Sequence, residues 1–144
     1  MSDHRSERLV DSPGVVDLRR AYASFANEIW APRIAARVND YDVKIANGDG
    51  GYVWHAHPET DEFFLVLEGE LTIELDGREP VVLGPQQLFT VPRGLRHRPS
   101  AAPGTRVLFF EPRGTVNSGD ADLSGDPWAI STTGLDLGAG LDAG

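Results

Sequence analysis

The sequence of 144 residues contains no cysteine. Disulfides, thiolate zinc sites and cysteine nucleophiles are therefore excluded, and any metal ion must be held by nitrogen and oxygen ligands. No stretch approaches the run of about 20 apolar residues that a membrane-spanning helix needs. Residues 1–10 carry charge in place of an apolar leader. We therefore expect a soluble cytoplasmic protein that does not associate with membranes.

Basic residues are scarce, because 13 Lys and Arg stand against 22 Asp and Glu, which gives a formal net charge of -9. Such a chain repels a phosphate backbone, so nucleic acid is not expected as a partner. The sequence also lacks a Gly-rich phosphate loop, a G-x-S-x-G nucleophile turn, a helical H-E-x-x-H motif and internal repeats. Several common enzyme classes are thereby excluded.

Short runs of β-branched and aromatic residues make up most of the chain, separated by Gly, Pro, Asn and Asp. The runs are IAARV, YDVKIA, GYVWHAH, EFFLVLE, ELTIELD, PVVL, LFTV and TRVLFFE. They predict an all-β domain with antiparallel meander pairing, in which Glu68-Gly69 and Asp76-Gly77 form tight hairpin turns. A hydrophobic content of 40 % is enough for one core.

A helix is predicted before the strands, with Ser12 as its N-cap, Pro13 at its first position and Trp30-Ala31-Pro32 at its end. Apolar residues at spacings of three and four give it one stripe for docking on a sheet. This stripe consists of Val15, Leu18, Tyr22, Phe25 and Ile29.

Three regions follow from these patterns: an N-terminal arm and helix at 1–33, a barrel at 34–115 and a C-terminal extension at 116–144. After Glu111 the chain is mostly Gly, Ser, Asp and Pro, and only residues 127–130 are apolar enough to dock. We expect residues 131–144 to form a disordered tail that can be removed with little loss of stability.

Three histidines and one glutamate form the pattern that carries chemistry. His55 and His57 are two residues apart in a β-prone run, so their imidazoles leave the same side of the sheet. Glu62 opens the next strand after a turn, and His97 could complete the set from the facing wall. Three His and one Glu suit one divalent ion of iron, zinc, manganese, nickel or cobalt, with one or two positions left open.

A histidine alone in a strand is more often hydrogen-bonded in the core or at the surface than a metal ligand. The sequence, however, has only four histidines, and three of them fall in this pattern. His4 lies in the charged start of the chain and is interpreted as solvated. Ligand type, spacing and strand geometry together favour the metal site.

The chain resembles the small bacterial single-domain members of the cupin superfamily. The first family motif, G-x5-H-x-H-x3-4-E-x6-G, is matched by His55, His57, Glu62 and Gly69, and the second, G-x5-P-x-G-x2-H-x3-N, by Pro92, Gly94 and His97. Three positions depart from the motifs: Asp49 and Gln86 stand where glycines belong, and Ala101 replaces the asparagine. These departures affect turns rather than ligands.

The resemblance spans roughly residues 34–115 and implies a cupin-type double-stranded β-helix, or jelly-roll, barrel and a homodimer. The short N-terminal helix predicted above is an addition that the motifs do not cover. It allows isomerases, dioxygenases, lyases and decarboxylases, and it leaves the catalytic residues unknown. A fold hosts many chemistries, so the reaction stays open.

Residues beside the predicted ligands supply further candidates. Three of them share the inward parity of the ligands and are predicted to line the pocket, although core packing explains them equally well: Val53, Phe64 and Val66. Arg93, at the barrel mouth, could meet an anionic substrate, but a solvated turn residue is the more common case. Trp54 should point away from His55. Lys44, the only lysine, is expected to face solvent.

The leading functional hypothesis is a metal-dependent enzyme that acts on a small polar organic molecule through an open coordination position. The alternative is a non-catalytic module that binds a sugar or an organic acid, with the metal orienting the ligand. A third hypothesis, a purely structural metal, is weaker, because an ion inside a closed barrel adds little to the core.

Overall fold

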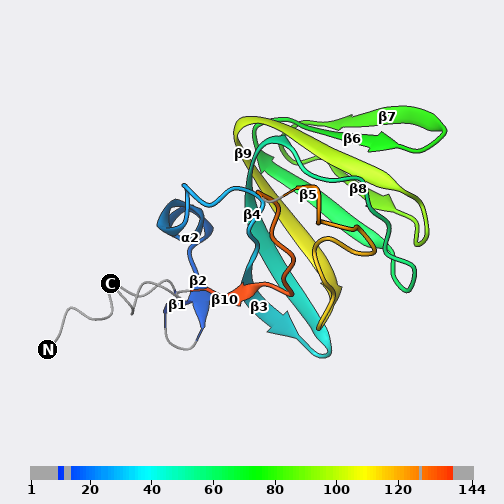
Figure 1. The fold of residues 1–144 in the computed structure, drawn as a ribbon. Helices are drawn as coiled ribbons and strands as arrows, with labels where there is room; N and C mark the ends of the chain where they lie inside the picture. Colours follow the sequence, from blue (N-terminus) through cyan, green and yellow to red (C-terminus); the bar gives the residue numbers. More distant parts are fainter. Residues whose placement is uncertain (1–9, 12–13, 127, 138–144) are drawn as a thin grey trace, which may run out of the picture.

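A computed structural model describes residues 10–11, 14–126 and 128–137 of the chain. The all-β prediction is confirmed, and the described part has one short helix (Figure 1). The elements are β1 (Val10–Asp11), β2 (Val15–Val16), α2 (Leu18–Ser24), β3 (Arg33–Val38), β4 (Tyr41–Gly51), β5 (Glu62–Glu68), β6 (Leu71–Leu75), β7 (Arg78–Leu83), β8 (Leu88–Val91), β9 (His97–Pro112) and β10 (Leu135–Asp136).

Strand β9 organises the sheet, because it pairs with three other strands along its length (Figure 1). Its first residues pair with β6, and its later residues lie between β4 and β5. The described strands β3 to β10 form one sheet in the order β10-β3-β4-β9-β5-β8, with β6 and β7 joined to it through β9. The sheet curls around an interior in the manner of a jelly roll.

The meander pairing expected from the turns is only partly correct. Asp76 and Gly77 join β6 and β7, which pair as an antiparallel hairpin. Glu68 and Gly69 join β5 and β6, which do not pair with each other; β5 instead pairs with β8 and β9. A turn sequence fixes a reversal of the chain, but it does not fix which strand becomes the neighbour.

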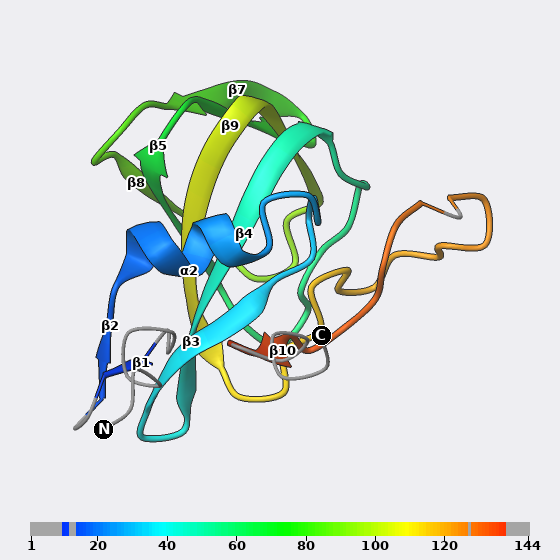
Figure 2. The same cartoon turned by 90° about the vertical axis from the view of Figure 1, so that its left-hand side faces the viewer.

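Strand β4 is covered on both faces. Alternate side chains point to opposite faces, so Lys44 and Ala46 face the barrel interior while Ile45 faces helix α2. Figure 2 shows α2 lying across the outer side of β4 and β9. The outer cluster consists of Ala21, Tyr22, Phe25, Ala35 and Ile45.

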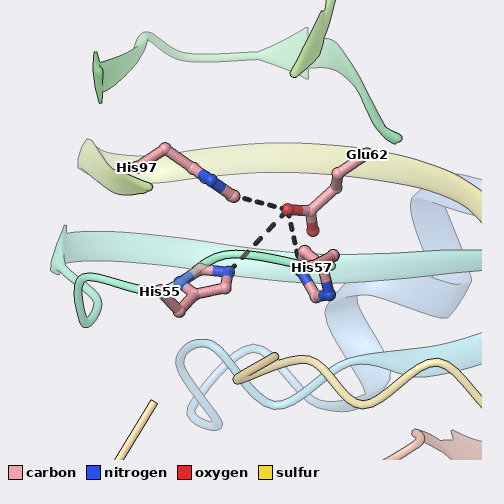
Figure 3. A group of neighbouring side chains, drawn as sticks. All are labelled: His55, His57, Glu62 and His97. Atoms are coloured by element: carbon pink, nitrogen blue, oxygen red, sulfur yellow. Dashed lines mark hydrogen bonds and ion pairs between the residues drawn. The ribbon is translucent and has the colours of Figure 1, made fainter. Parts of the chain in front are cut away.

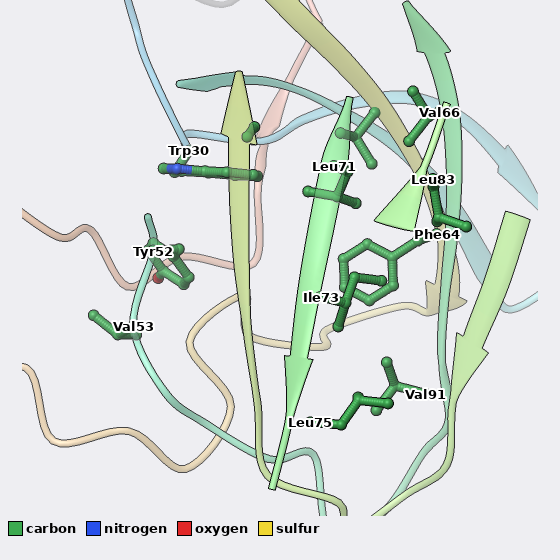
Figure 4. Packing of buried hydrophobic residues seen from close by; sticks show 12 residues of the cluster. Trp30, Tyr52, Val53, Phe64, Val66, Leu71, Ile73, Leu75, Leu83 and Val91 are labelled. Atoms are coloured by element: carbon green, nitrogen blue, oxygen red, sulfur yellow. The ribbon is translucent and has the colours of Figure 1, made fainter. Parts of the chain in front are cut away.

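The interior of the barrel is a separate apolar core (Figure 4). Its side chains come from β5, β6, β7, β8 and β9, from the segment before β3 and from the segment after β4. The fully buried members include Phe64, Val66, Leu71, Ile73 and Val107. Strands β5 and β6 show the alternation of buried and half-buried positions that one covered face requires.

The helix is shorter than the sequence pattern predicts. It begins at Leu18, where the carboxylate of Asp17 accepts a hydrogen bond from the Arg20 amide at 3.3 Å and acts as the N-cap. The predicted start at Ser12 and Pro13 lies outside the described residues. Val15 belongs to β2 and is exposed, so the predicted stripe is wrong at this position.

The C-terminal segment differs from the disordered tail that its composition predicts. Leu135 and Asp136 pair in parallel with β3, and the Leu137 amide donates to the Ile34 carbonyl at 3.0 Å. Residues 138–144 of the predicted tail lie outside the described part. No helix within the described residues is long and apolar enough to cross a membrane.

Candidate metal centre

Three separate elements bring the four predicted ligands together (Figure 3). Glu62 is the first residue of β5, and His97 is the first residue of β9. His55 and His57 lie in the segment after β4, which the sequence predicts as a strand. This segment is instead irregular and pairs with β9 only through a bridge between His55 and His97.

The ligand atoms of the group converge on one point. One ligand atom from each of the four residues lies within 4.8 Å of the others. The carboxylate oxygen Oε1 of Glu62 lies 2.7 Å from Nε2 of His97, 3.1 Å from Nε2 of His57 and 3.8 Å from Nε2 of His55. All four side chains are buried.

The backbone orients two of the imidazole rings. Nδ1 of His55 lies 2.9 Å from the carbonyl oxygen of Val53, and Nδ1 of His97 lies 2.9 Å from that of Leu95. A carbonyl oxygen only accepts, so Nδ1 must carry the proton in each ring. In a neutral ring, Nε2 then presents a lone pair to the centre of the group.

The charges of the group are strongly coupled. Burial raises the pKa of Glu62, but the three imidazoles around the carboxylate outweigh burial and hold the pKa well below its usual range. Burial lowers the pKa of His57, but the neighbouring Glu62 carboxylate outweighs this effect, so the pKa is raised above its ordinary value. The centre therefore favours positive charge beside an ionised carboxylate.

These residues fit a divalent transition metal. The Nε2 atoms of His55 and His57 are buried and have no hydrogen-bond partner within the described residues. Lone pairs of His97 and Glu62 face each other across 2.7 Å, an arrangement that needs a proton or a cation between them. Imidazole nitrogens with one carboxylate oxygen are ligands that zinc, iron, manganese, nickel and cobalt accept.

A cavity adjoins this centre and contains a charged pair that the sequence analysis missed. Lys44 was expected to face solvent, and this expectation is wrong, since only 1 % of its surface is exposed. Its Nζ lies 3.3 Å from Oε2 of Glu111, which is also buried. Both residues line the cavity together with His55 and Glu62. Alternation along β4 correctly placed Lys44 and its neighbours on opposite faces of the strand, but it could not show that both faces are covered.

Of the residues predicted to line the pocket, Phe64 lies in the cavity wall. Val53 and Val66 are buried in the apolar core and do not line the cavity. Arg93 lies outside it, where its guanidinium pairs with Asp61 at 3.2 Å. Trp54 is 38 % exposed and carries the Arg96 guanidinium 5.8 Å from its ring centroid.

The C-terminal extension reaches the centre. The carboxylate of Asp120 accepts a hydrogen bond from the Ala56 amide, between the two histidines of the segment, at 2.7 Å. Asn117 lines the cavity, and the Tyr52 hydroxyl donates to the Ile130 carbonyl at 3.0 Å. Residues of the extension thus hold the segment that carries His55 and His57.

The two departures from glycine in the family motifs also have local consequences. The register of β4 against β9 shifts between Gly48 and Gly50, so Asp49 lies at an irregularity in this strand pair. Gln86 keeps a left-handed backbone, with φ of 67°, although it has a side chain. Neither residue belongs to the group of four ligands.

Comparison with known proteins identifies the class. The family model of the cupin domain (Cupin_2) matches residues 41–111. The uncharacterized protein YdbB of Bacillus subtilis (strain 168) is 41 % identical over 78 residues, which cover 54 % of this chain and 69 % of YdbB. A cupin-2 domain containing protein from Shewanella frigidimarina NCIMB 400 is 34 % identical, with a TM-score of 0.65, covering 69 % of this chain and 95 % of that chain.

A more distant structure shares the fold alone. Hydroquinone 1,2-dioxygenase from Sphingomonas sp. TTNP3, solved with 4-hydroxybenzoate bound, matches with a TM-score of 0.59 at 18 % identity. The match covers 66 % of this chain and 73 % of that chain. The jelly-roll fold and these relatives define the class, and the chain belongs to the cupin superfamily.

Proposed function

We propose that this cupin binds one divalent transition metal through His55, His57, Glu62 and His97 and acts as an enzyme on a small polar organic molecule. The observation that carries the proposal is the convergence of the four ligand atoms, with two buried Nε2 atoms that lack a hydrogen-bond partner in the described part of the chain. Four protein ligands leave one or two positions of a five- or six-coordinate ion for a substrate.

When bound, such a metal polarises a carbonyl or enol oxygen or lowers the pKa of a water molecule. The residues of the chain then supply the surroundings. Phe64, Phe109 and Trp30 give the cavity apolar walls, and Lys44 and Glu111 place a charged pair in the same cavity. Because the accessible wall of the cavity is mostly apolar, the electrostatic effect of each charged group in it is strengthened.

Metal analysis tests the first half of the proposal. Protein purified without a chelator or an affinity resin, and then loaded, should contain close to one metal ion per chain. His57→Ala should lose this metal, whereas His4→Ala, which alters the one histidine outside the group, should keep it. Stoichiometric metal in His57→Ala would overturn the assignment of the ligands.

A substrate screen under aerobic and anaerobic conditions tests the second half. Iron together with oxygen uptake would assign a dioxygenase, and zinc, nickel or manganese without oxygen demand would assign isomerase or lyase chemistry. Sugars or organic acids that raise Tm without being converted would instead assign a non-catalytic binding module and overturn the enzymatic proposal.

A further inference from the structure

Lys44 is a buried cation with a donor to spare. Its Nζ donates to the Thr115 carbonyl at 2.8 Å and to Oε2 of Glu111 at 3.3 Å. An ammonium group carries three N–H bonds, so these contacts within the described residues leave one of them for another acceptor. The contact with Glu111 is longer than the roughly 2.7–2.9 Å of a close charge-assisted hydrogen bond, so the pair is not tightly closed.

The cavity beside Lys44 has walls built largely from aromatic rings. The space at this site that no atom fills is about 430 Å³, a value that includes open solvent at its mouth. Four aromatic rings line it: Trp30, Tyr52, Phe64 and Phe109. The rings form two contacts, Trp30 with Tyr52 at 6.1 Å between centroids (Figure 4) and Phe64 with Phe109 at 5.3 Å. Aromatic walls favour flat apolar bodies.

The charges of the cavity favour an anion once the metal is present. A divalent ion more than offsets the carboxylate of Glu62, and Lys44 offsets Glu111, so the loaded cavity carries net positive charge. In the metal-free protein, burial and then the charge of Glu62 raise the pKa of Glu111 to about 7, against the opposing effect of Lys44. A proton on Glu111 would leave Lys44 unneutralised in that state, so Lys44 favours an anion without the metal as well.

We propose that Lys44 is the anion-binding residue of the cavity, and that the site takes a small carboxylate with a flat apolar body. The carboxylate accepts the spare N–H of Lys44, the body lies among the aromatic walls, and the metal centre contacts the same ligand. This inference rests on the proposed function for the contact with the metal, which strengthens binding, whereas the preference for an anion comes from Lys44 itself. It places the substrate of the cupin among small organic carboxylates.

Two pairs of probes test the inference: benzoate with benzamide, and the smaller crotonate with crotonamide. Each pair keeps the flat body and changes the charge. Binding to the full-length protein is measured by titration calorimetry and by the fluorescence of its tryptophans. At least one carboxylate should bind the wild type more tightly than its amide, by a factor on the order of ten or more. Failure of both carboxylates to bind would overturn the proposal.

Two matched variants test whether Lys44 carries the positive charge that binds the carboxylate. Lys44→Met should remove the preference for the carboxylate, weakening its binding on the order of tenfold. Arg93→Met makes the same change in net charge at an exposed position and should leave both affinities unchanged. Equal loss in both variants, or no loss in Lys44→Met, would show that Lys44 does not bind the anion.

The wild-type protein allows the same test without a substitution that could disturb folding. Lys44 is the only lysine, so protein labelled with ¹⁵N-lysine gives one side-chain ammonium signal. The carboxylate should shift this signal, and the amide should not. A signal that does not move at saturating carboxylate would overturn the inference.

Metal content, measured on the same samples, separates this inference from the proposed function. A preference for the carboxylate that depends on Lys44 is expected with and without metal, and the metal-free protein should bind more weakly. Protein that takes up no metal but shows this preference would refute the metal proposal alone. Protein that takes up one metal but binds acid and amide alike would refute the anion site alone.

Discussion

His55 and His97 face each other across a bridge in which each backbone amide donates to the carbonyl of the other, at 2.9 and 2.8 Å. In both residues, Nδ1 also contacts the carbonyl oxygen two positions earlier in the chain. The same local arrangement therefore fixes the protonated nitrogen of both rings and aims both Nε2 atoms at Glu62. The backbone prepares the ligand group for a cation.

Metal retention should fall as the pH is lowered, because protons compete with the metal for the imidazole nitrogens. The carboxylate of Glu62 raises the pKa of His57 in the metal-free protein, so this competition begins above the ordinary pKa of histidine, about 6.5. Because three histidines can each take up a proton, metal retention should fall more steeply with pH than it would if a single proton competed. Equilibrium dialysis against a weak chelator, corrected for its own protonation, measures the curve. Constant retention between about pH 8 and 5.5 would exclude these histidines as ligands.

Two glycines with left-handed backbones provide a matched test of the packing around β9. Gly69 and Gly77 have φ of 86° and 70°, so alanine is strained at both. A Cβ at Gly77 meets open space, whereas one at Gly69 collides with the backbone of Thr105. Gly77→Ala should cost about 1 kcal/mol in the free energy of unfolding, and Gly69→Ala roughly 3 kcal/mol or more. Equal losses in urea denaturation would contradict the packing at Gly69.

The ligand group was predictable from the sequence, because two histidines at a spacing of two, a following glutamate and a distant histidine form a pattern that needs no tertiary detail. Lys44 was not predictable in the same way. Its neighbours Val43 and Ile45 suggested one apolar and one solvated face. Strand β4, however, is covered by α2 on one side and faces the barrel interior on the other. Periodicity assigns faces, and only the fold decides what covers them.

The pairing of the strands was not predictable from the sequence for a related reason. Glu68-Gly69 and Asp76-Gly77 look alike as turns, yet only the second joins paired strands. The partners of β5 are β8 and β9, at distances along the chain that no local signal spans. The docked segment at 135–137 was missed because its contacts are mainly backbone hydrogen bonds, which Gly- and Asp-rich sequence does not exclude.

Two truncations should separate the docked C-terminal segment from the residues after it. A chain cut after Ser131 loses β10 and the hydrogen bonds between Asn117 and Thr132, at 2.9 and 2.8 Å. We expect its Tm to fall by roughly 4 to 8 °C, which corresponds to about 2 kcal/mol. A chain cut after Leu137 loses mostly Gly, Ala and Asp, so its Tm should equal that of the full-length protein. The same Tm for both truncations would show that 132–137 does not dock.

The homodimer expected from the family resemblance stays a prediction, and the outer face of the sheet offers a place for it. Phe63 pairs with Phe110 across β5 and β9, and Leu65 pairs with Leu88 across β5 and β8. Leu88 and Phe110 are 57 % and 38 % exposed. Light scattering at micromolar concentration should give twice the mass of one chain, and Phe110→Glu should give a monomer. A monomeric wild type would contradict this prediction.

Glu111 should make stability depend on pH near neutrality. Burial and the charge of Glu62 raise its pKa to about 7 in the folded protein, although Lys44 opposes the shift. In the unfolded chain a glutamate loses its proton at about pH 4.3. The folded state therefore holds a proton that the unfolded state has released, so this contribution to stability is complete in acid and is lost as the pH rises through about 7.

Glu111→Gln removes this titration and keeps the shape of the side chain. In metal-free protein, urea denaturation should show that the wild type loses stability relative to the variant between about pH 5 and 8, by on the order of 2 kcal/mol. Titration of the histidines is present in both proteins and largely cancels in the difference. Glu79→Gln, at an exposed position on β7, is the matched control and should follow the wild type. A constant difference in stability between the wild type and Glu111→Gln across this range would contradict the prediction. It would show that burial does not keep Glu111 protonated, and that the Glu111 carboxylate neutralises Lys44 at each pH of the range.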